Sequence, residues 1–157
     1  MTNTKTAAVQ DGTNPAVAFR QECRHTVATY KQQAEWQEMS NRWIHLAGVN
    51  RYTYNFAFMG RPIIQFPQDM VAFQEIVWDV KPDLIIETGI AHGGSLIMSA
   101  ALLSMLDYCD AVSAGKQLDP KASGRKVIGI DIDIRAHNRR EIESHPMAHK
   151  IQLIEGS

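Results

Sequence analysis

The chain has 157 residues, of which 45% are apolar and 21% charged, and its formal net charge is −1. This length suits one globular domain with a sizeable core, and the near-zero charge argues against nucleic-acid binding through a basic surface. No run of about 18 apolar residues predicts a membrane span, and the N-terminus lacks the apolar stretch of a signal peptide. Two cysteines are too few for a disulfide framework, so we expect a cytoplasmic protein with free thiols.

The chain divides into three predicted parts. Residues 1–14 are small and polar and predict a disordered tail. Residues 15–82 predict a cap region of helices and aromatic side chains. Residues 83–157 predict the first half of a Rossmann-like α/β domain, truncated at its C-terminal side.

Two helices are predicted within the cap region. Asn14 and Pro15 suit the cap and first position of a helix that runs to about Met39, with an apolar stripe that predicts packing. Asp69 opens a second helix, which Pro82 stops. Between the helices, an aromatic stretch is broken by glycines and prolines and predicts an irregular strip packed against the domain.

Three short apolar runs follow, at residues 84–88, 126–131 and 150–155, separated by helices over about 95–108 and 136–144. This β-α-β-α-β pattern predicts a parallel sheet. With the strands numbered along the chain, their predicted spatial order in the sheet is 3-2-1. The first strand then has an apolar edge without a partner, which invites pairing with further chain. We therefore expect a truncated gene product, a fragment, or one half of a split or swapped assembly.

The sequence ETGIAHGGS at residues 87–95 leaves the first strand and enters a helix. Its glycines allow positive φ, and the helix start offers free N–H groups to a polar ligand. A dinucleotide fingerprint would have glycine where Ala91 stands, and a P-loop would have a lysine that this turn lacks. Glu87, two positions before the first glycine, suits a cationic group such as an α-ammonium.

Polar residues also end the second and third strands. Asp131 and Asp133 follow the second strand, where an acid can accept hydrogen bonds from both ribose hydroxyls. The third strand ends in Glu155, Gly156 and Ser157, where an adenine edge would lie. An amino group, a carboxylate and a nucleoside together outline S-adenosylmethionine.

From about Asn55 to Ser157 the chain resembles the cephalosporin hydroxylase/rhamnosyl O-methyltransferase family of S-adenosylmethionine-dependent enzymes. The matching segments are MGRPIIQFPQDM, QEIVWDVKPDLIIETGIAHGGSLI, VIGIDIDIR with AHNRR, and IQLIEGS. The resemblance implies a Rossmann-like methyltransferase fold, a turn that surrounds the methionine part of the cofactor, acids that hold the ribose, and a terminal serine that reaches the adenine. The cofactor-binding residues that it implies are Glu87, Gly89, Ala91, His92, Gly93, Ser95, Asp131, Asp133 and Ser157.

The resemblance also bears on a metal. Members of the family often use a divalent ion, usually Mg²⁺, to orient the acceptor hydroxyl. In that fold the metal ligands and the acceptor pocket follow the third strand, where this chain ends, so we assign neither a metal ligand nor a catalytic residue. His137, His145 and His149 do not form a ligand set, because Pro146 interrupts their helical spacing.

Three functions stay open. The first is an O-methyltransferase that acts on a small-molecule acceptor, a natural-product or sugar hydroxyl, with the activity of the truncated chain left open. The second is a non-catalytic fragment that binds the cofactor. The third is a nicotinamide-dependent oxidoreductase, against which Ala91 weighs. Neither nucleic acid nor a membrane is an expected partner, whereas a homo-oligomer is compatible with the sequence.

Overall fold

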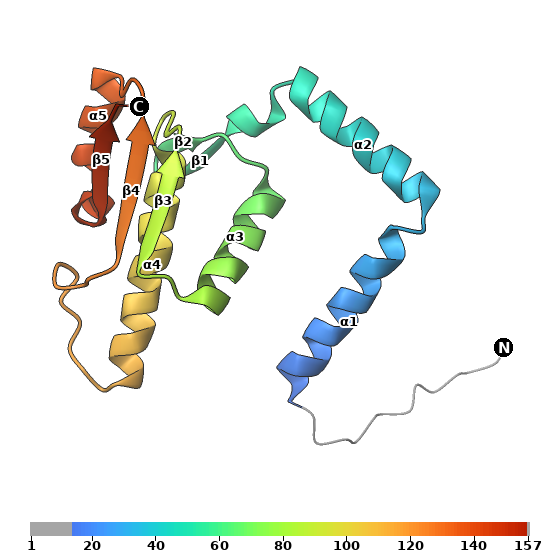
Figure 1. Cartoon of the computed structure of the whole chain (residues 1–157), viewed down its shortest axis with the longest axis horizontal. Coiled ribbons are helices and arrows are strands. Elements are labelled where there is room, and N and C mark those ends of the chain that lie inside the picture. The colour runs from blue at the N-terminus through green and yellow to red at the C-terminus, as the bar shows by residue number, and fades with distance from the viewer. Residues whose placement is uncertain (1–13, 157) are drawn as a thin grey trace. The chain divides into compact units, whose positions relative to one another are not determined.

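A computed structural model describes residues 14–156 and divides the chain into two units (Figure 1). The helical unit extends to Leu46 and the sheet unit begins at Ala47, so the predicted boundary between residues 82 and 83 falls inside the sheet unit. The elements in chain order are α1 Pro15–Tyr30, α2 Ala34–Val49, η1 Tyr52–Asn55, β1 Phe56–Phe58, β2 Arg61–Ile63, α3 Pro67–Val80, β3 Leu84–Thr88, α4 Gly94–Ser113, β4 Lys126–Asp131, α5 Ala136–Glu143, η2 Pro146–Lys150 and β5 Ile151–Glu155. The predicted tail lies outside the described residues, except for Asn14.

The predicted start of α1 is confirmed. Pro15 is the first helical residue, and the Asn14 side chain accepts a hydrogen bond from the backbone N–H of Ala16 at 3.0 Å. Within the helical unit, the apolar stripe of this helix is not buried. Phe19 is 63% exposed and Val27 is 57% exposed, and α1 has no buried residue.

The prediction of one continuous helix is wrong, because α1 ends at Tyr30 and α2 begins at Ala34. The backbone carbonyl of Tyr30 accepts hydrogen bonds from the Gln33 N–H at 3.2 Å and from the Gln37 side-chain amide at 3.1 Å. The ring of Tyr30 stacks on Trp36, with centroids 4.9 Å apart. These contacts stabilise a bend where the sequence has neither the glycine nor the proline that signals one.

The aromatic stretch contains a hairpin that the sequence analysis missed. Strands β1 and β2 pair antiparallel, with Phe58 opposite Arg61. Met59 and Gly60 connect them, and both have positive φ, 44° and 84°, which is the conformation of a two-residue hairpin turn. The His145 ring nitrogen Nε2 lies 3.0 Å from the Met59 carbonyl and ties this turn to the C-terminal part of the sheet unit.

Strands β3, β4 and β5 form a parallel sheet in that spatial order, as predicted. Strands β3 and β4 have the predicted bounds, and β5 begins one residue later, at Ile151. Helix α4 runs to Ser113, beyond the predicted end near residue 108. Helix α3 begins at Pro67 rather than at Asp69, and it ends before Lys81, whose φ of 48° closes the last turn.

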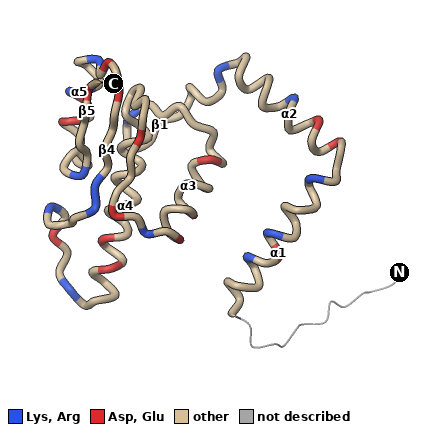
Figure 2. The backbone as a smooth tube through the Cα atoms, viewed as in Figure 1, with Lys and Arg blue, Asp and Glu red and all other residues tan. Residues whose placement is uncertain are grey.

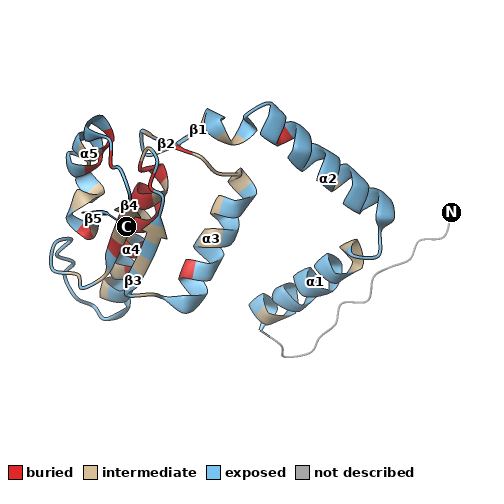
Figure 3. Ribbon diagram, turned by 45° about the horizontal axis from the view of Figure 1, so that its top comes forward, coloured by how far each residue is buried: buried red, intermediate tan, exposed pale blue. Residues whose placement is uncertain are grey.

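The core lies on one face of this sheet, and α4 contributes more residues to it than any other element (Figure 3). The core cluster consists of these buried residues: Val77 from α3; Leu96, Ala100, Leu103 and Leu106 from α4; Val127 from β4; Ile142 from α5; and Ile90 and Ile134 from the strand-end loops. By length and composition alone, α4 could cross a membrane. Its buried leucines pack on the sheet, which is what the central helix of an α/β domain does.

The opposite face of the sheet carries apolar side chains that are exposed. Leu84 and Ile86 of β3 are 47% and 58% exposed, and Ile154 of β5 is 40% exposed. Strand alternation places these three on the face away from α4, because Ile85 and Leu153 pack against the core cluster. Strand β3 is an edge strand within the described residues, so the predicted apolar edge is present.

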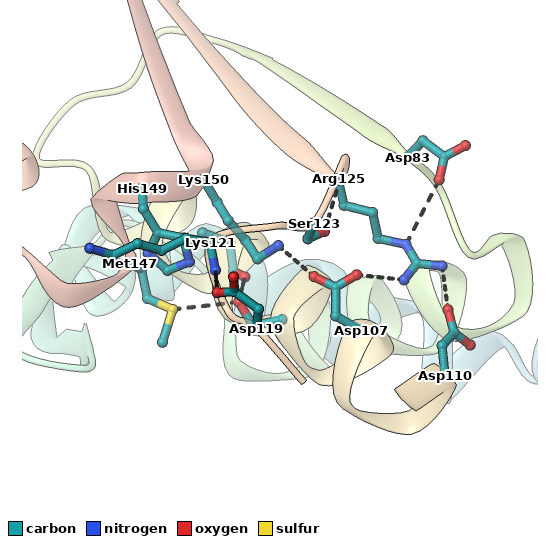
Figure 4. Close-up of polar contacts among 12 residues, drawn as sticks. Asp83, Asp107, Asp110, Asp119, Lys121, Ser123, Arg125, Met147, His149 and Lys150 are labelled. Atoms are coloured by element: carbon teal, nitrogen blue, oxygen red, sulfur yellow. Dashed lines mark hydrogen bonds and ion pairs between the residues drawn. The ribbon is translucent and has the colours of Figure 1, made fainter. Parts of the chain in front are cut away.

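An ionic cluster lies at the end of the sheet where β4 begins (Figure 4). The Asp107 carboxylate on α4 accepts hydrogen bonds from Lys150 Nζ at 2.5 Å and from Arg125 Nη1 at 2.7 Å, and Arg125 Nη2 donates to Asp110 at 2.7 Å. Lys150 is only 3% exposed. The cluster joins α4 to the starts of β4 and β5. Outside this cluster, acidic and basic residues are interspersed along both units (Figure 2).

Candidate functional site

The turn between β3 and α4 has an unusual backbone. Gly89, Ala91 and Gly93 have φ values of 77°, 45° and 82°, so three of five consecutive residues are left-handed. Ala91 is the only one of these three residues that is not a glycine, and its Cβ disfavours the left-handed region of φ and ψ. The Gly89 N–H donates to the Ile130 carbonyl at 2.8 Å and holds the turn against β4, and the Gly93 N–H donates to the Ile90 carbonyl at 2.8 Å within the turn.

Two cavities adjoin this turn. The larger, of about 470 Å³, is lined by Pro62, Ile63, Ile64, Gln65, Asp69, Phe73, Glu87, Thr88, Gly89, Ile90, Ala91, His92, Gly94, Ser95, Met98 and Ser99. The smaller, of about 370 Å³, is lined by Ile64, Ala91, His92, Asp131, Asp133, Arg135 and Asn138. Ile64, Ala91 and His92 belong to both, so the turn separates them. Together they have the size and the mixed lining of a small-molecule site.

In the larger cavity, Glu87 of β3 accepts a hydrogen bond from the hydroxyl of Ser95, in the first turn of α4. Burial raises the pKa of the Glu87 carboxyl above its usual 4.5, and the Ser95 hydrogen bond offsets part of that rise. Next to this pair, the first N–H groups of α4 have no carbonyl partner within the helix. The cavity therefore offers a carboxylate to a cation and helix N–H groups to an anion.

In the smaller cavity, Asp131 ends β4 and also supports the turn. Its Oδ2 accepts a hydrogen bond from the Ile90 N–H at 2.9 Å, and its Oδ1 lies 3.3 Å from the Asp133 N–H. A carboxylate has about four acceptor positions, so Asp131 retains capacity for two hydroxyl donors. Arg135, which directly precedes α5, and Asn138, which lies within α5, also line this cavity.

The structure brings most of the predicted site residues to these cavities. Glu87, Gly89 and Ser95 line the larger one, Asp131 and Asp133 line the smaller one, and Ala91 and His92 line both. Gly93 lines neither. A Cβ on Gly93 would lie 2.4 Å from Ile142 Cδ1, so this glycine permits α5 to pack on the turn.

The end of β5 has a partner of its own. Glu155 accepts a hydrogen bond from Arg139 Nη2 at 2.7 Å, and the Gly156 N–H donates to the Asp131 carbonyl at 3.0 Å. Ser157, to which the resemblance gives the adenine contact, lies outside the described residues. Arg139 of α5 thus forms an ion pair with the last residue of β5.

Sequence reasoning missed three residues at this site. Arg61 and Asn138 hydrogen-bond to the turn, and Gly94 lets α4 approach β2. Arg61 stands in the segment MGRPIIQFPQDM and Asn138 in AHNRR, both of which carry the family resemblance, but only the folded chain shows what they contact. Within residues 14–156, no three His, Cys, Asp or Glu side chains gather closely enough to hold a metal ion.

Comparison with known proteins agrees with the resemblance. The sequence model of the rhamnosyl O-methyltransferase/CmcI family matches residues 50–157. None of the curated proteins matches the chain. Two solved structures, titled "cmcI-N160 SAH" and "cmcI-D160 Mg-SAM", are each 21% identical, with TM-scores of 0.43 and 0.44. The matches cover 65% and 66% of this chain but only 43% and 37% of those proteins.

The family match covers more than two-thirds of the chain, including both cavities and the whole parallel sheet. The sheet order and the glycine turn after its first strand are those of a partial Rossmann-like fold. The chain is a member of the rhamnosyl O-methyltransferase/CmcI family.

Proposed function

We propose that this chain binds S-adenosylmethionine and provides the cofactor half of an O-methyltransferase whose acceptor is a small natural-product or sugar hydroxyl. The observation that carries the proposal is a pair of acids at neighbouring strand ends. Glu87 and Asp131 line two cavities that meet at one glycine turn. We further propose a cytoplasmic location and retain a homo-oligomer as a prediction.

The cofactor fits the donors and acceptors that are present. Glu87 would accept the α-ammonium in the larger cavity, and the first N–H groups of α4 beside Ser95 would receive the carboxylate. Asp131 would accept both ribose hydroxyls in the smaller cavity. When bound, S-adenosylmethionine supplies a methyl group on a sulfonium, and these residues bind and orient it. No Mg²⁺ ligand is assigned, since the described residues contain no group of three or more His, Cys, Asp or Glu side chains that could hold a metal ion.

A nicotinamide dinucleotide would fit less well. Its pyrophosphate would lie over the turn, where the Glu87 carboxylate is held in a partly buried cavity. Two like charges at short distance in such a place repel strongly. Ala91 also replaces the glycine that lets a backbone approach the pyrophosphate.

Asp131 variants test the proposal. Asp131→Ala removes the ribose acceptor and the partner of the Ile90 N–H, so we expect the Kd for S-adenosylmethionine to rise about 100-fold. Asp131→Asn retains an oxygen for Ile90 but loses the charge, so we expect a rise of only about 10-fold. Calorimetric titration measures both. Asp79→Ala, an exposed acid on α3, is the matched control and leaves the Kd unchanged. Unchanged affinity in Asp131→Ala contradicts the proposal.

Cofactor binding will release a proton from Glu87 as the pH falls toward its pKa. Burial raises that pKa in the free protein, and a bound ammonium favours the charged carboxylate, so binding weakens as Glu87 becomes protonated. Calorimetric titration in buffers of different ionisation enthalpy measures the number of protons released on binding. Glu87→Gln abolishes the buffer dependence.

The same raised pKa fixes how Glu87 changes folding stability with pH. A raised carboxyl pKa stabilises the fold below the unfolded pKa, and this contribution is lost as the pH rises through the folded pKa.

A further inference from the structure

The turn that separates the two cavities is held by side chains from two distant segments. Arg61, the first residue of β2, donates from Nε at 3.1 Å and from Nη2 at 2.7 Å to the backbone carbonyl of His92. Asn138 of α5 donates from Nδ2 at 2.9 Å to the carbonyl of Ala91. Two consecutive carbonyls of the turn are thus each held by a side chain.

The two holding side chains are buried and joined to one another. The Arg61 side chain is 13% exposed, and Asn138 is 4% exposed. Arg61 Nη2 lies 3.3 Å from Asn138 Oδ1, and Arg61 Nη1 lies 3.6 Å from Glu141 Oε2. Burial makes loss of either partner costly, since the remaining polar group then has no water to replace it.

These contacts fix the direction of the neighbouring amides. The peptide bond is planar, and its N–H points opposite to its C=O. Holding the Ala91 carbonyl therefore fixes the N–H of His92, and holding the His92 carbonyl fixes the N–H of Gly93. The Gly93 N–H donates to the Ile90 carbonyl at 2.8 Å, which closes the turn. The same bonds retain Ala91 at a φ of 45°, a conformation that an alanine disfavours on its own.

We propose that Arg61 is a positioning residue for the cofactor site, which together with Asn138 holds the backbone of Ala91 and His92 in the one conformation that forms both cavities. Arg61 lines neither cavity, so it acts through the turn. The role in cofactor binding rests on the proposed function above. The role in holding the turn does not, and it is measured separately.

The first measurement is amide hydrogen exchange over the turn in the cofactor-free full chain. We expect Arg61→Met to raise the amide exchange rates of residues 89–93 about 10- to 100-fold, because the variant loses both charged hydrogen bonds to the His92 carbonyl. Arg61→Lys, which keeps one charged donor, restores part of the protection. Unchanged exchange in Arg61→Met overturns the proposal, whether or not the chain binds the cofactor.

Arg125→Met is the matched control. Arg125 has a side chain 15% exposed and is also held by carboxylates, but it precedes β4 at the opposite end of the sheet (Figure 4). Compared at equal fractions folded, this variant leaves exchange in the turn unchanged. Protection lost equally in Arg61→Met and Arg125→Met shows general destabilisation and overturns the positioning role.

The second measurement is the Kd for S-adenosylmethionine. We expect a rise of about 10- to 100-fold in Arg61→Met, a smaller rise in Arg61→Lys, and less than about 3-fold in Arg125→Met. Failure of the wild-type chain to bind the cofactor contradicts the proposed function alone, because the exchange result still decides whether Arg61 holds the turn. A wild-type chain that binds, with an Arg61→Met variant of equal affinity, overturns the positioning role.

Discussion

Replacing Asp107 with alanine will destabilise the sheet unit by about 3–5 kcal/mol, the usual cost of leaving a buried charge without its partner. Asp107 is 12% exposed at its side chain and pairs with both Lys150 and Arg125. Lys150 is 3% exposed, so removal of the carboxylate leaves its ammonium in a buried position without this partner. Urea unfolding of the variant beside the wild type measures the loss.

An exposed carboxylate in the same cluster provides the control. Asp83 lies 3.9 Å from Arg125 Nε, with its side chain 92% exposed, and Asp83→Ala should cost less than about 0.5 kcal/mol. Equal losses in Asp83→Ala and Asp107→Ala would show that burial does not govern this cluster.

The pH dependence of the Asp107 contribution has a definite sign. Burial raises the pKa of Asp107, but hydrogen bonds from Lys150, Ser123 and Arg125 outweigh it and hold the pKa below its usual 3.8. A depressed carboxyl pKa gives stability that is present above the unfolded pKa and is lost as the pH falls through the folded value. The stability difference between wild type and Asp107→Ala should therefore shrink in acid.

Gly94→Ala will separate the hairpin from the start of α4. A Cβ at this position would lie 2.3 Å from the Pro62 carbonyl oxygen and 2.8 Å from Ile63 Cα, both backbone atoms of β2. Ile63 is 2% exposed, so the strand has little room to move. We expect a loss of about 3 kcal/mol, at the upper end for overpacking, together with weaker cofactor binding, because β2 carries Arg61.

Gly48→Ala is the control for this change. Gly48 lies in the last turn of α2, and a Cβ there would meet no atom within 4 Å. Alanine favours the helix over glycine by up to about 1 kcal/mol, so this variant should be neutral or slightly stabilised. A Gly94→Ala variant as stable as Gly48→Ala would contradict the close packing of α4 on β2.

Local sequence pattern predicts the sheet well and the cap region poorly. Strands β3 and β4 are short apolar runs bounded by charged or turn-forming residues, and the glycines after β3 mark the turn to α4. The break after Tyr30 has no such signal, since hydrogen bonds to one carbonyl and one stacked ring pair create it. The β1–β2 hairpin has strands of three residues and a Met59-Gly60 turn, too little pattern for either strand to be recognised.

The candidate site divides in the same way. Glu87 and Asp131 stand directly at strand ends, so their positions follow from the order of the strands. Arg61 and Asn138 reach the turn from 31 and 47 residues away in sequence, and no local pattern records such contacts. Adjacent glycines also have different roles: Gly93 accommodates Ile142 and Gly94 accommodates β2, which only the packing distinguishes.

We infer that one glycine turn, with an acid on either side, forms a site for S-adenosylmethionine. Calorimetric titration of the full chain with S-adenosylmethionine, alongside NADH, tests it most directly. We expect saturable binding of S-adenosylmethionine and no binding of NADH, since Glu87 and Ala91 disfavour a pyrophosphate at the turn. Tight binding of NADH, or no binding of S-adenosylmethionine, would contradict the claim.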